Sequence, residues 1–174
     1  EGGSFNTPRA FATIFDLIRE LNTALTADNL NESSVGAAKE FLKEVVVSQR
    51  EILEKTEIGI ARDKRIKIED SFATIITGVR RCGKSTFLNQ LLVKEKRAYY
   101  LNLEDPRLDE FELADFNKVE GIMGELYGEG GVYFFDEIQS VKKWEKFIRY
   151  LVDKKEKVVI TGSNASLLSR ELGT

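Results

Sequence analysis

The order of apolar and polar residues predicts two helices in the first third of the chain. Thr7 and Pro8 are typical of a helix start, because threonine caps helix N-termini and proline suits the first helical position. Apolar residues then recur at helical spacing from Phe11 to Leu25 and predict one buried face. The polar stretch over 28–34 is expected to end this helix. A second helix is predicted from about residue 34, with a stripe formed by Val35, Ala38, Leu42, Val45, Val46, Gln49, Ile52 and Leu53.

From about residue 58 the pattern changes to short β-branched or aromatic runs that alternate with amphipathic stretches. Strands are predicted at 72–77, 98–103, 131–135 and 158–161. Helices are predicted between them at 84–94, 108–127 and 141–154. This alternation is typical of an α/β fold, a parallel sheet with helices on both faces. We therefore expect an N-terminal helical extension over 5–57 and a core domain over 58–174.

Charge and composition exclude few folds. Of the 174 residues, 42% are apolar and 32% are charged, which is ordinary for a globular domain with a packed core. The 26 basic and 29 acidic residues give a net charge of −3, so nucleic-acid binding is left to a local basic patch. No apolar run approaches the roughly 18 residues that cross a bilayer, so no membrane partner is expected.

The counts of histidine and cysteine exclude more of the chemistry. The absence of histidine excludes a catalytic triad with an imidazole base and most zinc sites. The single cysteine excludes an intrachain disulfide, and a lone thiol suits the reducing cytoplasm, which is the expected location. Proton chemistry must therefore depend on Asp, Glu, Lys or Tyr side chains.

An unbroken phosphate-loop (Walker A) motif, G-x-x-x-x-G-K-[ST], spans residues 78–85. It follows a predicted strand and opens a predicted helix, so loop amides and the helix N-terminus can both face a phosphate. Lys84 is expected to bind the β- and γ-phosphates and to act in catalysis, and Ser85 to bind Mg²⁺. The alternative is a glycine-containing loop with a serine N-cap. The expected nucleotide-binding residues are Gly78, Val79, Arg80, Arg81, Cys82, Gly83, Lys84, Ser85 and Thr86.

Two further strands end in polar residues. The third predicted strand is followed by Asp136 and Glu137, at the sheet edge where open α/β folds bind ligands. In this Walker B position Asp136 is expected to hold Mg²⁺, and Glu137 to polarise the attacking water. The fourth predicted strand leads to Asn164, whose amide is expected to reach the γ-phosphate or that water. The alternative is that Ser163 and Asn164 cap the following helix.

Four segments together resemble prokaryotic AAA+-type ATPases. The most specific features are the doubled arginine at 80–81 and the Glu-Asp-Pro-Arg sequence at 104–107. The resemblance covers about residues 59–174 and implies ATP with Mg²⁺ as cofactors, Asn164 as the γ-phosphate sensor, and an extra strand between the Walker A and Walker B strands. The segments that carry it are 76–86, 101–108, 134–139 and 160–164.

The same resemblance implies parts that this chain does not contain. Members of the family usually carry a C-terminal domain similar to restriction-type nucleases, and the chain stops before the last core strand and any lid. A missing C-terminal domain or a protein partner is therefore expected, while a homo-oligomer is left open. Arg170 is the only local candidate for an arginine finger.

The expected function is Mg²⁺-dependent hydrolysis of ATP, with Lys84, Glu137 and Asn164 as the catalytic residues. One alternative is a nucleotide-gated switch with negligible turnover, which the lack of a lid and of a clear arginine finger favours for this fragment. The presence of Glu137 favours hydrolysis. A small-molecule kinase is a third alternative, but we identify no segment for an acceptor-binding lid.

Two smaller predictions concern the same sheet edge. Glu104 and Asp105 are expected to form a solvated turn before Pro106, with assistance to Mg²⁺ as the alternative. Alkylation of Cys82 is expected to block nucleotide binding, and bound ATP to protect the thiol. Burial of Cys82 against the sheet is the alternative.

Overall fold

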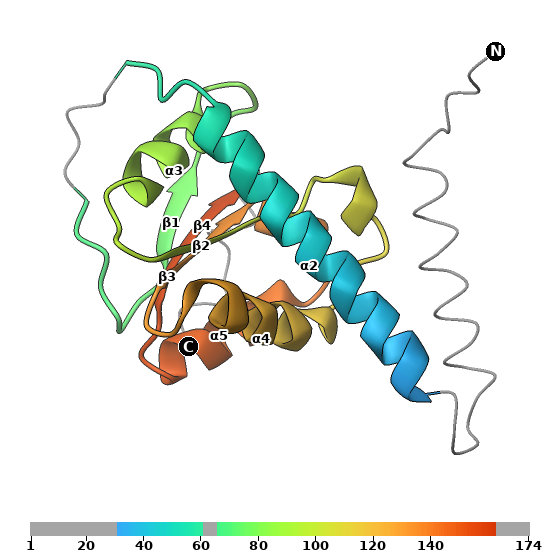
Figure 1. The fold of residues 1–174 in the computed structure, drawn as a ribbon. Coiled ribbons are helices and arrows are strands. Elements are labelled where there is room, and N and C mark those ends of the chain that lie inside the picture. The colour runs from blue at the N-terminus through green and yellow to red at the C-terminus, as the bar shows by residue number, and fades with distance from the viewer. Residues whose placement is uncertain (1–30, 61–65, 163–174) are drawn as a thin grey trace, which may run out of the picture.

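The computed structural model describes residues 31–60 and 66–162 (Figure 1). The helix expected over 7–25 therefore lies outside the described residues. The α/β fold is confirmed, with strands and helices alternating along the chain. In order, the elements are α2 (Asn31–Lys55), β1 (Thr74–Thr77), α3 (Lys84–Leu92), β2 (Ala98–Asn102), a 3₁₀ turn (Pro106–Leu108), α4 (Asp115–Tyr127), β3 (Val132–Asp136), a second 3₁₀ turn (Ile138–Ser140), α5 (Trp144–Asp153) and β4 (Lys157–Gly162).

The four strands form one parallel sheet in the order β1-β4-β3-β2. The last strand of the described residues, β4, thus lies between the Walker A strand β1 and the Walker B strand β3, as the resemblance implies. The register pairs Asn102 with Asp136 across β2 and β3, and Thr77 with Gly162 across β1 and β4. Because all strands are parallel, their carboxyl ends meet at one edge of the sheet.

Side chains of the sheet alternate between two apolar cores, since successive residues of a strand point to opposite faces. Tyr100 and Phe134 pack with α3 on one face, and Leu101 and Phe135 pack with α2, α4 and α5 on the other. Figure 1 shows α3 apart from α4 and α5, on the other side of the strands. All five residues of β3 are buried, as expected for a strand covered on both faces.

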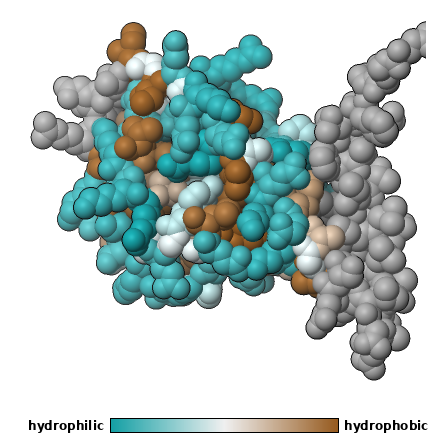
Figure 2. Space-filling view, viewed as in Figure 1, coloured by the Kyte–Doolittle hydropathy of each residue, from teal (hydrophilic) through white to brown (hydrophobic). Residues whose placement is uncertain are grey.

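Helix α2 packs against both β2 and α4. Most of its predicted apolar stripe is buried, and Phe41 is buried as well. Two of its predicted members, Val35 and Ile52, are 49% and 63% exposed, while Leu53 is partly buried against the core on the α3 face. The face viewed in Figure 2 is mostly hydrophilic, with apolar residues exposed only in small groups, as is usual for a folded domain.

Several predicted boundaries are wrong. Residues 31–34, expected in a turn, belong to α2, because polar residues are tolerated in the first turn of a helix. The helix expected from Leu108 begins at Asp115, since Pro106 starts a 3₁₀ turn that ends at Leu108. Strand β1 begins at Thr74, and Phe72 is 74% exposed.

Candidate functional site

The turn between β1 and α3 contains the Walker A sequence. Gly83 precedes the first residue of α3 and has φ 83°, a left-handed conformation that residues with side chains rarely adopt. At Gly78 a Cβ atom would lie 2.8 Å from Cys82 Sγ, so a larger residue there would require movement of that side chain. The backbone geometry therefore accounts for both glycines of the motif, and it lets the loop approach a ligand closely.

A cavity of about 620 Å³ lies at this loop. That volume is within the range of small-molecule sites. An ion pair joins Arg80 of the loop to Glu104 beyond β2; the two side chains are 76% and 53% exposed. The cavity is lined by Arg80, Arg81, Gly83, Lys84, Ser85, Thr86, Glu104 and Glu137.

Lys84 and Glu137 form a buried ion pair inside this cavity. The Lys84 side chain is 5% exposed and the Glu137 side chain 12%, and Lys84 Nζ lies 3.3 Å from Glu137 Oε1. Lys84 Nζ also donates to the carbonyl of Val79 at 3.4 Å. The structure thus brings a predicted phosphate ligand against the predicted water-polarising carboxylate, although the two residues are 53 positions apart in the sequence.

Asp136 is 3% exposed at the end of β3. Burial raises the pKa of its carboxyl group above the ordinary value, although hydrogen bonds from the Thr161 and Ser85 hydroxyls act in the opposite direction. The Thr161 hydroxyl donates to Asp136 and accepts from the Glu137 amide N–H at 2.9 Å. Thr161 therefore holds both acidic residues from the neighbouring strand β4.

Tyr100 lies beside Asp136 on the α3 face of the sheet. Burial raises the pKa of the Tyr100 phenol, and the charge of Asp136 raises it further. The phenol stays protonated at neutral pH and can donate to the carboxylate. The sequence analysis singled out neither Tyr100 nor Thr161, although a hydroxyl at the end of an otherwise apolar strand was a visible signal for Thr161.

Glu137 leaves β3 in a left-handed conformation, with φ 52°. A 3₁₀ turn follows, closed by a bond of 3.1 Å from the Ser140 N–H to the Glu137 carbonyl. This turn returns the side chain of Gln139 to Glu137, and Gln139 Nε2 donates to Glu137 Oε2 at 2.5 Å. Gln139 is a further neighbour of the site that sequence reasoning did not single out.

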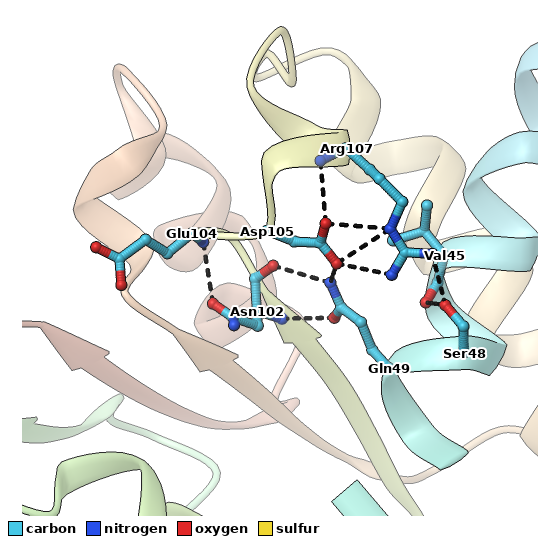
Figure 3. A network of polar contacts seen from close by, with 7 residues as sticks. All are labelled: Val45, Ser48, Gln49, Asn102, Glu104, Asp105 and Arg107. Atoms are coloured by element: carbon cyan, nitrogen blue, oxygen red, sulfur yellow. Dashed lines mark hydrogen bonds and ion pairs between the residues drawn. The ribbon is translucent and has the colours of Figure 1, made fainter. Parts of the chain in front are cut away.

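A second polar cluster joins α2 to the loop after β2 (Figure 3). Gln49 pairs with the open edge of β2, since its Nε2 donates to the Asn102 carbonyl at 3.0 Å and its Oε1 accepts from the Asn102 N–H at 2.8 Å. The same Nε2 donates to Asp105 Oδ2 at 2.9 Å. Arg107 Nη2 donates to that oxygen at 2.7 Å, and Arg107 Nη1 donates to Ser48 at 2.8 Å.

The prediction that residues 104–105 form a solvated turn is wrong for Asp105. Its side chain is only 14% exposed, because α2 covers it. Burial alone raises the pKa of Asp105, but hydrogen bonds from Arg107 and Gln49 outweigh burial and hold that pKa below the ordinary value. The carboxylate is thus engaged by Arg107 and Gln49. It also lines a second cavity of about 320 Å³ together with Ser85 and Asp136, so the alternative role beside Mg²⁺ stays a prediction. Glu104 points away from this cluster (Figure 3).

The remaining predicted residues divide into two groups. Cys82 is exposed, so the alternative of burial against the sheet is wrong, while protection of its thiol by ATP stays a prediction. Val79 is 75% exposed and lies outside the cavity lining. Asn164, the expected γ-phosphate sensor, and Arg170, the arginine-finger candidate, lie outside the described residues.

Metal-binding clusters and membrane-spanning helices are the next features to consider. Over 31–60 and 66–162, no group of three or more Cys, Asp or Glu side chains has the arrangement of a metal site. A Mg²⁺ ion bound through a carboxylate, a hydroxyl and substrate phosphates does not require such a group. No helix within the same ranges combines the length and apolar character of a membrane span.

Comparison with known protein families identifies the family of the domain that contains this site. Residues 70–174 match the model of a family described as an AAA domain. The chain belongs to this AAA domain family. Such membership indicates an ATPase-like, nucleotide-binding phosphate-loop protein, and the family in general uses a nucleotide with Mg²⁺. A second family model, described as a DALR domain, matches residues 5–47, which include the first part of α2.

The curated relatives are uncharacterized proteins. One from Methanocaldococcus jannaschii is 39% identical over 147 residues, covering 83% of this chain and 33% of the relative. One from Haemophilus influenzae is 34% identical, covering 63% of this chain and 30% of the relative. Another from M. jannaschii is 27% identical and covers 63% of this chain and 25% of the relative. The chain thus spans a third or less of these relatives, and no solved structure matches it.

Proposed function

We propose that this AAA domain binds ATP with Mg²⁺ and hydrolyses the γ-phosphate. The observation that carries the proposal is the meeting of Lys84, Asp136 and Glu137 at the carboxyl edge of the sheet, with Lys84 Nζ 3.3 Å from Glu137 Oε1. One cation and two carboxylates at the end of a phosphate-loop strand are the groups that phosphoryl transfer requires.

Phosphate binding is assigned to the loop and to the start of α3. Amides of residues 78–84 and the N-terminus of α3 supply partial positive charge, and the ammonium of Lys84 supplies a full one. The cavity of about 620 Å³ has room for a triphosphate. Arg80 and Arg81 lie on the lining and add positive charge at its rim. The choice of adenine follows from the resemblance to AAA+-type ATPases.

The residues present fit a Mg²⁺ ion. Ser85 offers a hydroxyl and Asp136 a carboxylate, both hard oxygen ligands, and both line one cavity beside α2. Among the described residues 31–60 and 66–162, Asp136 forms no ion pair, and Lys84 is paired with Glu137. When bound, Mg²⁺ would neutralise charge on the phosphate oxygens.

Hydrolysis would consume one water molecule. The water oxygen attacks the γ-phosphorus, and the bond from phosphorus to the β,γ-bridging oxygen breaks, which leaves ADP and inorganic phosphate. Glu137 orients this water and accepts its proton, while Lys84 stabilises negative charge on the γ-phosphate. Asn164 is proposed as the sensor of that phosphate. Catalysis then depends on positioning and on charge, with no covalent intermediate.

The nucleotide cycle is proposed to act on a protein partner or on a further C-terminal domain. The support is that the curated relatives are about three times as long as the matched region or longer. A nuclease-like identity for that domain stays a prediction from the resemblance, as do a homo-oligomer, DNA contact and a cytoplasmic location.

Calorimetric titration with Mg-ATP, Mg-ADP and Mg-GTP tests the binding step. We expect binding of ATP and ADP, weaker binding of GTP, and loss of all three with Lys84→Ala. Lys118→Ala is the matched control, because Lys118 pairs with Asp115 and lines neither cavity of the site. Binding that survives in Lys84→Ala would contradict the proposed phosphate site.

Phosphate release over many turnovers tests the hydrolysis step. We expect turnover that Glu137→Gln abolishes while ATP still binds. Binding of ATP without turnover in the unmodified chain would favour the nucleotide-gated switch. Turnover that persists in Glu137→Gln would contradict the role of Glu137.

A further inference from the structure

Gln139 is held against Glu137 by the fold of the segment after β3. Glu137 ends the strand in a left-handed conformation, and the 3₁₀ turn Ile138–Ser140 places Gln139 two residues later beside the same carboxylate. Ile138, in the same turn, is fully buried and anchors the turn in the apolar core. The position of the Gln139 side chain is therefore set by packing as well as by its own hydrogen bond.

The direction of the hydrogen bond between Gln139 and Glu137 follows from the charge of the carboxylate. Gln139 Nε2 lies 2.5 Å from Glu137 Oε2. An ionised carboxylate only accepts hydrogen bonds, so the amide nitrogen and not the amide oxygen must face it. A hydrogen bond to a charged group at this distance is among the stronger kinds in proteins.

The two oxygens of Glu137 have different neighbours. Oε1 faces the Lys84 ammonium at 3.3 Å, and Oε2 accepts from Gln139 at 2.5 Å. Lys84 is therefore partly neutralised by the carboxylate that is proposed to orient the attacking water. A phosphate that binds Lys84 has to compete with Glu137 for the same ammonium group.

We propose that Gln139 is a positioning residue that holds the Glu137 carboxylate through Oε2. Lys84 can then leave Oε1 and bind a nucleotide phosphate, while Glu137 keeps its orientation toward the attacking water. This inference rests on the proposed function, because it assigns a second residue to the action of Glu137. Without the amide donor, the carboxylate would lose the hydrogen bond at Oε2, would attract Lys84 more strongly and would oppose phosphate binding more strongly.

The first test needs no hydrolysis. Mg-ADP affinity is measured by calorimetry for the unmodified chain, Gln139→Leu, Glu137→Gln and the double variant. We expect Gln139→Leu to weaken ADP binding about five-fold, which corresponds to the net contribution of one ordinary intramolecular hydrogen bond. We expect no such weakening when Gln139→Leu is added to Glu137→Gln, since the neutral amide no longer competes for Lys84.

The second test measures ATP turnover. Gln139→Leu is expected to lower kcat about ten-fold, by leaving Glu137 loosely oriented. Gln139→Glu, which keeps the length of the side chain but replaces the donor with a negative charge, is expected to lower kcat at least as much. Tyr99→Phe is the control for a lost buried hydrogen bond elsewhere, because the Tyr99 hydroxyl bonds to Gly128 and Gly131 and lines neither cavity; it should reduce thermal stability without changing kcat or ADP affinity.

The outcomes test the positioning role of Gln139 and the proposed hydrolysis separately. Equal weakening of ADP binding by Gln139→Leu with and without Glu137→Gln overturns the positioning role, because the effect would then not pass through Glu137. Unchanged ADP binding in Gln139→Leu overturns it as well. If the unmodified chain binds ADP but does not hydrolyse ATP, the proposed hydrolysis fails while the affinity cycle still decides the role of Gln139.

Discussion

Asp105 lies in the loop after β2, and Asp136 is the last residue of the neighbouring strand β3, yet their surroundings shift the pKa values of the two carboxyl groups in opposite directions. Asp105 receives a guanidinium and an amide, and its pKa is held below the ordinary value. Asp136 receives hydroxyls and is 3% exposed, and its pKa is raised by burial. The difference separates a carboxylate that a guanidinium neutralises from one that is buried beside hydroxyl groups.

The two carboxylates therefore contribute to stability with opposite signs. For Asp105, the lowered pKa means a stabilising contribution above the ordinary pKa of about 4, which is lost as the pH falls through the folded-state value. For Asp136, the raised pKa means that the folded state binds the proton more tightly. Stability then falls as the pH rises from about 4 through the folded-state value.

The largest expected difference between the two residues is in ATP turnover. We expect Asp136→Asn to lower Mg²⁺-dependent phosphate release by about 100-fold or more, because a charged ligand at the transition state is lost. Asp105→Asn should change it less than about two-fold, the rough limit for a residue without contact to the reacting groups. Equal losses of turnover in both variants would break the comparison.

The next effect is on folding. Asp105→Ala is expected to lower the free energy of unfolding by about 2 kcal/mol, because Arg107 and Gln49 lose their shared acceptor. Urea denaturation at pH 7 measures the change. Loss of less than about 0.5 kcal/mol would place this cluster among ordinary surface ion pairs. Ser48→Ala, which removes only the outer contact of Arg107, is the milder control.

A smaller effect of opposite sign is expected at Asp136. In the presence of a chelator, Asp136→Asn should raise the free energy of unfolding at pH 7 by about 1 kcal/mol, since the buried charge is removed. The gain should disappear as the pH falls below about 4, where the carboxyl is protonated in both the folded and unfolded states. A gain that is constant from pH 3 to pH 7, or a loss at pH 7, would contradict the raised pKa.

The smallest effect is expected at the ion pair of Arg80 and Glu104. Both side chains are largely exposed, so Arg80→Ala should change the free energy of unfolding by less than about 0.5 kcal/mol. The pair joins the Walker A loop to the residue before Asp105, and a loss near that of Asp105→Ala would mean that the two regions unfold as one network. Double-variant denaturation with Glu104→Ala tests this coupling.

Much of the architecture could be predicted from local patterns. Alternating runs indicated the parallel sheet, and the spacing of the glycines with Lys84 indicated a phosphate loop between a strand and a helix. The acidic pair after an apolar run indicated a carboxylate at the sheet edge. These features depend on backbone conformation and side-chain period over a few residues, which the order of residues dictates directly.

The partners of the polar side chains could not be predicted in this way. Gln49 belonged to a predicted apolar stripe, yet its amide pairs with Asn102, 53 positions away. Thr161 holds Asp136 from strand β4, which follows β3 by a helix in the sequence but is adjacent to it in the sheet. The sequence by itself determined the elements and the chemical groups at their ends. Only the tertiary structure decided which carboxylate a guanidinium neutralises and which is buried beside hydroxyl groups, because that depends on contacts between segments far apart in the chain.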